Sequence, residues 1–237
     1  MKKWLTFAMS LLMVTTLAMT ACTKKEETPP ETQSAETPQD ASASEQEEVE
    51  PVDIGVSDEG GIYQNETIGF EIQLPKDWYV MDVEEMEAMA QENTANNPAA
   101  QAMLPYLTQL VVAYDAKNAA EGVGVNTIYI LLQEPTEFKD VKLLMNREKE
   151  NMELSKKAMG TASDLFEISD LEEKTISGKT YYVLSNTFTG ENGVAITSDM
   201  YCAQLEDGTF LEMSFSYKDE AGKKAAEDAI ASIKHTK

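Results

Sequence analysis

The clearest pattern in the chain is an alternation of apolar and polar residues, which predicts β-strands. In residues 67–74 every second residue is apolar, as in a strand buried on one face. Residues 109–116 and 124–133 are apolar on both faces, which is typical of central strands covered on two sides. The same reasoning predicts strands at 78–81, 178–189, 195–205 and 209–218. The last two are joined by Glu206-Asp207-Gly208, whose Asp-Gly pair favours a hairpin.

Helical spacing and capping residues predict helices between and after these strands. Asp82 followed by Glu85 indicates a capping box, opening a helix whose inward face is Val83, Met86, Met89 and Ala90. Asn96-Asn97-Pro98 ends that segment and starts the next. The longest helix is predicted over 138–159, and Asp219 caps a final helix ending near Ile233, with Ala226, Ala229, Ile230 and Ile233 facing the sheet. Strands and helices are segregated, so we expect an α+β fold in which helices flank an antiparallel β-sheet.

The N-terminal segment has the organisation of a secretory signal. Lys2 and Lys3 precede an apolar stretch, and small residues lead to Cys22. Met19-Thr20-Ala21-Cys22 resembles the lipobox of bacterial prolipoproteins, in which the cysteine is lipidated and becomes the new N-terminus. We therefore predict a lipoprotein signal peptide over 1–21 and lipid attachment, including palmitate, at Cys22. An ordinary secretory signal with a nearby cysteine is the alternative.

Residues 22–61 have the composition of a disordered tether. They contain 12 acidic and 2 basic residues, and neither the charge nor the low hydrophobicity favours a packed core. From 62 to 237 the composition is that of one globular domain. With 42 acidic residues against 19 basic ones, the chain repels nucleic acid and anionic head groups, so nucleic acid is excluded as an expected partner.

The start of this domain resembles a known family. Ile62-Tyr63 and the run TIGFEIQLPKDW, from Thr67 to Trp78, resemble the opening of PsbP-like domains. The closing hairpin, apolar strand and short helix ending at Ile233 are similar too. The resemblance covers nearly all of 62–233 and implies an α/β/α sandwich around an antiparallel sheet, usually non-enzymatic and often found in lipoproteins. No functional residue of the family carries over, because the matching residues are core and turn positions, and the metal ligands of plant members have no match.

Candidate catalytic residues are few. His235 is the only histidine, and its place three residues from the end predicts a surface position rather than a catalytic one. Cys202 shares a strand face with Ile196 and Met200, which predicts core packing over a reactive nucleophile. Trp78 is expected to anchor the core at the edge of the sheet.

Carboxylates are abundant, but no spacing singles out a catalytic pair. Six of them are expected to be solvated helix or turn charges: Glu84, Glu85, Glu87, Glu172, Glu173 and Glu191. Asp58-Glu59-Gly60-Gly61 and Glu191-Asn192-Gly193 are acidic turns without the ligand spacing of calcium loops. Gly122-Val123-Gly124 lacks the remaining residues of a phosphate loop.

We therefore expect a non-enzymatic accessory or binding module, anchored through Cys22 at the extracytoplasmic face of the cell membrane, with a protein or envelope partner. No cofactor, metal or catalytic residue is expected. The first alternative is a small-solute binding lipoprotein with a pocket between sheet and helices, and the second is a hydrolase built on carboxylates. A pocket holding two carboxylates, at least one of them with a perturbed pKa, would favour the enzyme.

Overall fold

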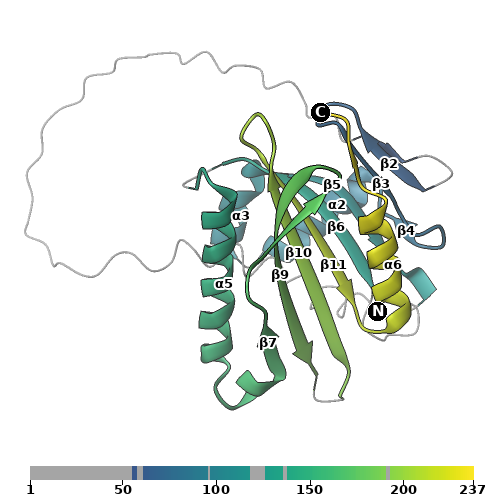
Figure 1. The fold of residues 1–237 in the computed structure, drawn as a ribbon. Coiled ribbons are helices and arrows are strands. Elements are labelled where there is room, and N and C mark those ends of the chain that lie inside the picture. The colour runs from purple at the N-terminus through teal and green to yellow at the C-terminus, as the bar shows by residue number, and fades with distance from the viewer. Residues whose placement is uncertain (1–54, 58–60, 96, 118–125, 136–137, 191–192) are drawn as a thin grey trace, which may run out of the picture.

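A large antiparallel sheet forms the centre of the domain in the computed structural model, which describes residues 55–57, 61–95, 97–117, 126–135, 138–190 and 193–237. Its strand order is β4-β5-β6-β11-β10-β9-β7, and β8 also pairs with β9. The bounds are β4 Tyr79–Val80, β5 Leu107–Tyr114, β6 Thr127–Gln133, β7 Phe166–Ile168, β8 Glu172–Ile176, β9 Lys179–Thr189, β10 Ala195–Gln204 and β11 Phe210–Tyr217. Figure 1 shows the sheet between helices α5 and α6.

One face of this sheet is covered by helix α6 (Glu220–Ala231) and by a smaller antiparallel sheet. The smaller sheet has the order β1-β2-β3-β12, with bounds Val56–Ser57, Ile62–Asn65, Phe70–Gln73 and Lys234–His235. Leu211, Met213 and Phe215 of β11 face this layer and are fully buried. The C-terminal strand β12 pairs with β3 near the start of the domain, so the two ends of the domain lie together (Figure 1).

The opposite face of the large sheet is covered by two helices. These helices are α2 (Val83–Thr94) and α5 (Val141–Ala158), and this face is named the helix-covered face. α5 packs on β9 and β10 through an apolar cluster that includes Leu144, Met145 and Met152. α2 packs on β5 and β6 through a second cluster built around Met86. The short helices α3 (Pro98–Met103) and η2 (Leu104–Tyr106) connect α2 to β5. None of the helices among the described residues is both long and apolar enough to span a membrane.

The predicted α+β class, with an antiparallel sheet flanked by helices, is confirmed. The central strands, the hairpin at Glu206-Asp207-Gly208 and the capping box of Asp82 and Glu85 are also confirmed. The strand predicted over 67–74 begins only at Phe70, because residues 66–69 form a turn in which Gly69 has φ +62°. Val83 is 41% exposed and does not face inward as expected.

The long helix starts later than predicted, because Asp140 caps it. The side chain of Asp140 accepts a hydrogen bond from the Leu143 amide at 3.0 Å, so Phe138 lies before the helix. The final helix ends at Ala231, since residues 234–235 leave it to form β12. Strand β1, at Val56–Ser57, falls within the segment assigned to the tether and pairs with β2.

Candidate functional site

A cluster of polar side chains lies buried on the helix-covered face, between the apolar clusters under α2 and α5. Strand register puts Glu212 of β11 opposite Leu131 of β6, and Ser214 opposite Tyr129. Directly opposed residues of an antiparallel pair share a face, and diagonal neighbours lie about 7–8 Å apart. One group of polar side chains therefore lies on this face: Glu212, Ser214, Tyr129 and, at the next pair of facing residues along the strands, Gln133. Helix α5 adds Glu148 to this group. These five residues are named the acid cluster.

Every member of the acid cluster is at most 5% exposed. Both carboxylate oxygens of Glu148, the Tyr129 hydroxyl, the Ser214 hydroxyl and the Gln133 amide oxygen have no hydrogen-bond partner among the described residues. Buried polar groups are normally hydrogen-bonded, because each unpaired one costs about 1–3 kcal/mol. Five unpaired atoms in one place therefore make the cluster unlike the rest of the core.

The electrostatics place the two carboxyl groups close together. Burial raises the pKa of Glu212 to about 7. Burial, followed by the charge of Glu212, raises the pKa of Glu148 well above its usual value, and the neighbouring Arg147 lowers it less. Burial and then Glu212 also raise the pKa of the Tyr129 hydroxyl. The charge of Glu212 thus contributes to the raised pKa of both Glu148 and Tyr129.

Sequence reasoning missed this pair. The two carboxyls come from α5 and β11, which are far apart in sequence, so no local spacing could join them. One signal was available in the sequence. Glu212 lies in an otherwise apolar strand that is covered on both of its faces, where a carboxyl group is shielded from solvent.

An open groove lies beside the cluster, between α2 and β5. It has a volume of about 270 Å³, and its walls are mainly apolar. The lining residues are Val83, Met86, Glu87, Ala90, Gln91, Leu104, Leu107, Thr108 and Gln109. Gln109 lies opposite Leu131 in the register, on the same rung as Glu212. This surface, named the α2 groove, therefore ends one strand away from the acid cluster.

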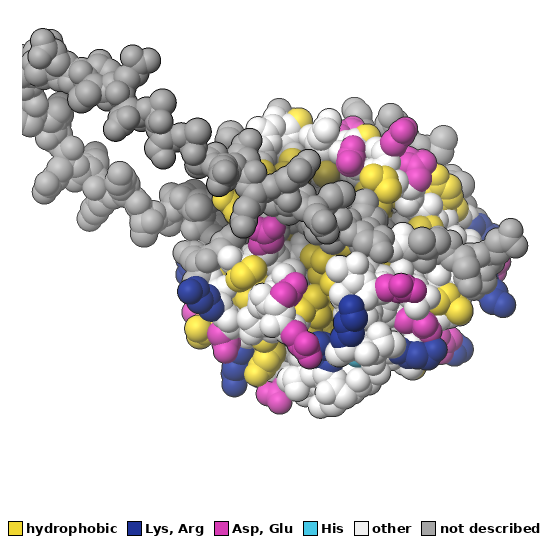
Figure 2. Space-filling model, turned by 90° about the horizontal axis from the view of Figure 1, so that it is seen from above, with side chains coloured by type: hydrophobic (Ala, Val, Ile, Leu, Met, Phe, Trp, Pro, Cys, Tyr) yellow, Lys and Arg dark blue, Asp and Glu magenta, His cyan; other side chains and the backbone are white. Residues whose placement is uncertain are grey.

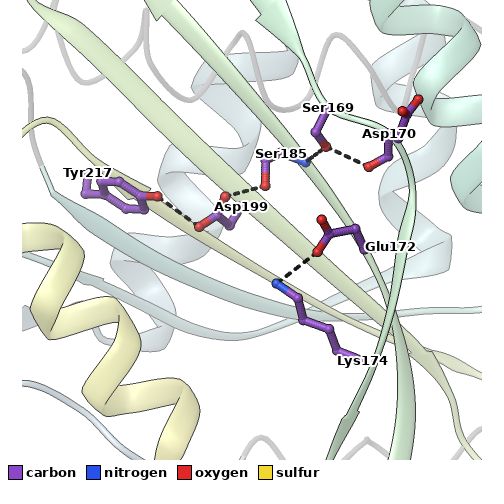
Figure 3. Close-up of polar contacts among 7 residues, drawn as sticks. All are labelled: Ser169, Asp170, Glu172, Lys174, Ser185, Asp199 and Tyr217. Carbon is purple, nitrogen blue, oxygen red and sulfur yellow. Dashed lines mark hydrogen bonds and ion pairs between the residues drawn. The ribbon is translucent and has the colours of Figure 1, made fainter.

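A second polar network crosses the other face of the sheet, where Figure 3 shows Tyr217, Asp199 and Ser185 in one line from β11 to β9. Ser185 donates to Asp199 Oδ1 at 2.5 Å, and Tyr217 donates to Oδ2 at 3.1 Å. The Ser185 amide donates to Ser169 Oγ at 2.9 Å. Each carboxylate oxygen of Asp199 therefore accepts one hydrogen bond, from Ser185 or from Tyr217. The network links strands β11, β10 and β9 by hydrogen bonds, which is a structural role.

The structure places His235 elsewhere than the sequence predicted. The residue belongs to β12, and its Nε2 lies 2.7 Å from the Tyr181 hydroxyl, against the ring of Phe70. Burial, and next the nearby Lys179, lower the pKa of His235 to about 4. The expectation of a surface tail residue is wrong, because pairing with β3 holds His235 half-buried against the domain. The hydrogen bonds of His235 among the described residues go to Tyr181 and Ser177, not to Ser185 or the acid cluster.

The other predicted positions divide into three groups. Cys202 is fully buried among α5 residues, as expected, and burial followed by Glu212 and Glu148 raises the pKa of its thiol. Trp78 packs at the edge of the core, also as expected. Glu84, Glu85 and Glu87 are exposed on α2, whereas Glu172 and Glu173 are exposed on edge strand β8 rather than on a helix or turn. Outside the described residues lie Cys22, Glu191, Asn192, Asp58 to Gly60 and Gly122 to Gly124.

No group of three or more His, Cys, Asp or Glu side chains that could hold a metal ion occurs within the described part of the chain. The surface seen in Figure 2 mixes acidic and basic side chains with hydrophobic ones, and no single charge dominates that view.

No family model matches the chain, and no curated protein sequence matches it. Solved structures with a similar fold include the following three. LpqN of Mycobacterium tuberculosis, which is involved in cell envelope biogenesis, is 15% identical over 71% of this chain and 83% of LpqN, with a TM-score of 0.44. The PsbP protein of Synechocystis is 15% identical over 73% of this chain and 91% of its own, with a TM-score of 0.45.

A protein of unknown function from Pseudomonas aeruginosa is 14% identical over 46% of this chain and 71% of its own, with a TM-score of 0.34. At these identities the likeness concerns the fold alone. One of these three structures is a PsbP protein, and the opening residues of this domain resemble those of PsbP-like domains.

Proposed function

We propose that the protein is a non-enzymatic binding module, held at the extracytoplasmic face of the cell membrane by a lipid on Cys22, and that it binds a protein partner through the α2 groove. The observation that carries the proposal is the groove itself. Its walls are mainly apolar, and Val83 at its edge is 41% exposed. Exposed apolar surface with a polar rim is typical of protein interaction sites. The net charge of −23 favours a partner with a basic surface around its apolar contact.

Three observations support a non-enzymatic role. Ser185 is hydrogen-bonded to a carboxylate, His235 to a tyrosine, and the Cys202 thiol is buried with a raised pKa. The raised pKa of the Cys202 thiol disfavours the thiolate that a cysteine nucleophile needs. Neither Glu148 nor Glu212 lines the α2 groove, so a substrate in that groove would not contact the carboxyl pair.

Site-specific crosslinking tests the docking surface. A photoreactive residue replaces Gln91, which lines the groove, or Ala88, which lies on the same helix outside it. In intact cells the Gln91 position should capture one partner that the Ala88 position does not capture. Equal capture from both positions would argue against the groove.

Affinity measurements with the captured partner then use two matched substitutions. Val83→Asp puts a charge into the groove, whereas Leu143→Asp changes a 59% exposed leucine on α5 outside it. We expect Val83→Asp to weaken binding at least about tenfold, since an unpaired charge is desolvated, and Leu143→Asp to leave it unchanged. Equal affinity of the two variants would disprove docking in the groove.

A second function, binding of a small solute between sheet and helices, is favoured by the acid cluster. Its unpaired oxygens lie in the position where such a pocket was expected. Competition between candidate solutes and the protein partner would separate the two functions, because the groove and the cluster are adjacent but distinct.

A further inference from the structure

The outer face of helix α5 carries the two most exposed large apolar side chains among the described residues. Leu143 is 59% exposed and Leu154 is 58% exposed, whereas Leu144, Met145 and Met152 pack on the sheet from the inner side of the helix. Isolated exposed leucines are common on protein surfaces. These two, however, are eleven residues apart, which is about three helical turns, so both lie on one face of α5.

The two leucines belong to a stripe of six residues that follow one another in alternate steps of three and four. These residues, named the α5 stripe, are Asp140, Leu143, Arg147, Glu150, Leu154 and Lys157. Steps of three and four are the spacing of the a and d positions of a coiled coil, which face a second helix. The side chains of Arg147 and Glu150 are 40% and 64% exposed, and Asp140 and Lys157 are exposed as well. The whole stripe is therefore accessible to a second helix at the side of the domain (Figure 1).

The order of residues in the α5 stripe is complementary to the same order reversed. In an antiparallel pair of α5 helices, Leu143 lies opposite Leu154 of the second copy, and Arg147 lies opposite the second copy's Glu150. Asp140 then lies opposite the second copy's Lys157 in the outermost layers. A two-fold interface makes each of these contacts twice, because residue i meets j and residue j meets i. Each leucine thus meets a leucine, and each charged residue meets one of opposite charge.

The charge of the α5 stripe also favours a second copy of this chain as its partner. The protein has a net charge of −23, so most of its surface repels a copy of itself. The stripe contains two acidic and two basic residues and is therefore locally neutral. Arg147 Nη1 donates to Glu150 Oε2 at 3.2 Å within the helix. A guanidinium group has five N–H donors, so this bond leaves Arg147 able to bind the second copy's Glu150 as well.

We propose that the α5 stripe is a homodimer interface, in which the α5 helices of two copies pack antiparallel about a two-fold axis halfway between Arg147 and Glu150. Each copy contributes two leucines, so the interface is small. We therefore expect a weak dimer, with a dissociation constant of roughly 10⁻⁵ to 10⁻⁴ M. The interface is independent of the proposed docking function, because no residue of the stripe lines the α2 groove.

Charge reversal tests the pairing, with sedimentation of the full chain in a density-matched detergent as the measurement. Arg147→Glu and Glu150→Arg should each weaken self-association at least about tenfold, because each puts like charges opposite one another in two layers. An equal mixture of the two variants should associate as the wild type does, since opposite charges meet again. Lys223→Glu, an exposed position on α6 with the same change in net charge as Arg147→Glu, should leave self-association unchanged. Circular dichroism checks that the variants fold.

Disulfide crosslinking tests the orientation of the two helices. Oxidation of a mixture of Leu143→Cys and Leu154→Cys chains should join unlike copies, whereas Leu143→Cys alone should crosslink no more than the wild type. Strong crosslinking of Leu143→Cys to itself would indicate parallel helices and overturn the proposal. A mixture of Arg147→Glu and Glu150→Arg that does not recover would overturn it as well. A wild-type chain that stays monomeric at about 10⁻³ M, well above the expected constant, would exclude the second copy and leave the helix of another protein as the partner of the stripe.

Discussion

At the scale of single residues, Glu212 makes the stability of the fold depend on pH. Its pKa is about 7 in the folded protein because burial penalises the charged form, whereas an exposed glutamate titrates near 4.5. The folded state therefore binds more protons than the unfolded state between these two values. The contribution of Glu212 to the free energy of unfolding is therefore most favourable below pH 4.5. The free energy of unfolding falls by an amount on the order of 3 kcal/mol as the pH rises to about 7, and it stays at this lower value at higher pH.

We predict that Glu212→Gln raises the melting temperature at pH 8 and has little effect at pH 4.5. Glutamine has the same shape without the charge, so it removes the penalty that appears as the carboxyl ionises. The expected gain at pH 8 is roughly 5–10 °C for a domain of this size. Thermal unfolding of both proteins at the two pH values measures it. A gain that is equal at both pH values would contradict the assigned pKa.

The position of a residue could be predicted where the apolar and polar pattern of its own segment was sufficient to determine it. Cys202 and Trp78 were placed in the core from their strands alone, and both are there. Glu212 was not singled out, because its burial depends on what packs over β11, which the local pattern of that strand does not specify. His235 was misplaced because a chain end usually frays, and only its pairing with β3 prevents that here.

At the scale of elements, the junction of α6 with β6 is the tightest contact around a glycine. Asn126, just before β6, accepts a hydrogen bond from the Lys218 amide, and Asp219 caps α6 through the Gly222 amide at 2.7 Å. A Cβ on Gly222 would lie 2.3 Å from Asn126 Cγ. Only glycine lets the first turn of α6 approach Asn126 this closely.

Gly222→Ala is therefore expected to destabilise the protein by about 1–3 kcal/mol, because the added methyl group displaces the Asn126 amide. Helix propensity alone predicts the opposite, since alanine is favoured over glycine by about 1 kcal/mol. Chemical denaturation of Gly222→Ala, Asn126→Ala and the double variant measures the coupling. If the alanine at 222 costs as much with Asn126 removed as with it present, the clash is not the cause.

Elements with strong local signals were predicted, and short edge elements were not. The capped helices and long apolar strands carry enough residues for a pattern. β7, β8 and β12 have three, five and two residues, and β8 is almost entirely exposed. Such strands form because β9 and β3 offer unpaired edges, which is a property of the assembled sheet.

At the scale of the whole molecule, the sheet separates two different interiors. The face under α6 and the small sheet is a continuous apolar core, while the face under α2 and α5 has two apolar clusters with the acid cluster between them. Stability therefore rests mainly on the first face, and the second is free to carry polar atoms. The proposed docking groove belongs to this second face.

The lipid anchor is tested through the two cysteines of the chain. We predict that Cys22→Ala abolishes labelling by a radioactive or clickable fatty acid, and that the protein is either released to the medium or left unprocessed, because lipidation and cleavage both need that thiol. Cys202→Ala is the matched control and should keep full labelling, since its thiol is fully buried in the folded domain. Labelling that survives in Cys22→Ala would move the anchor to another residue. Loss of labelling in both variants would mean that export depends on the folded domain, and the tether would then not act as an independent spacer.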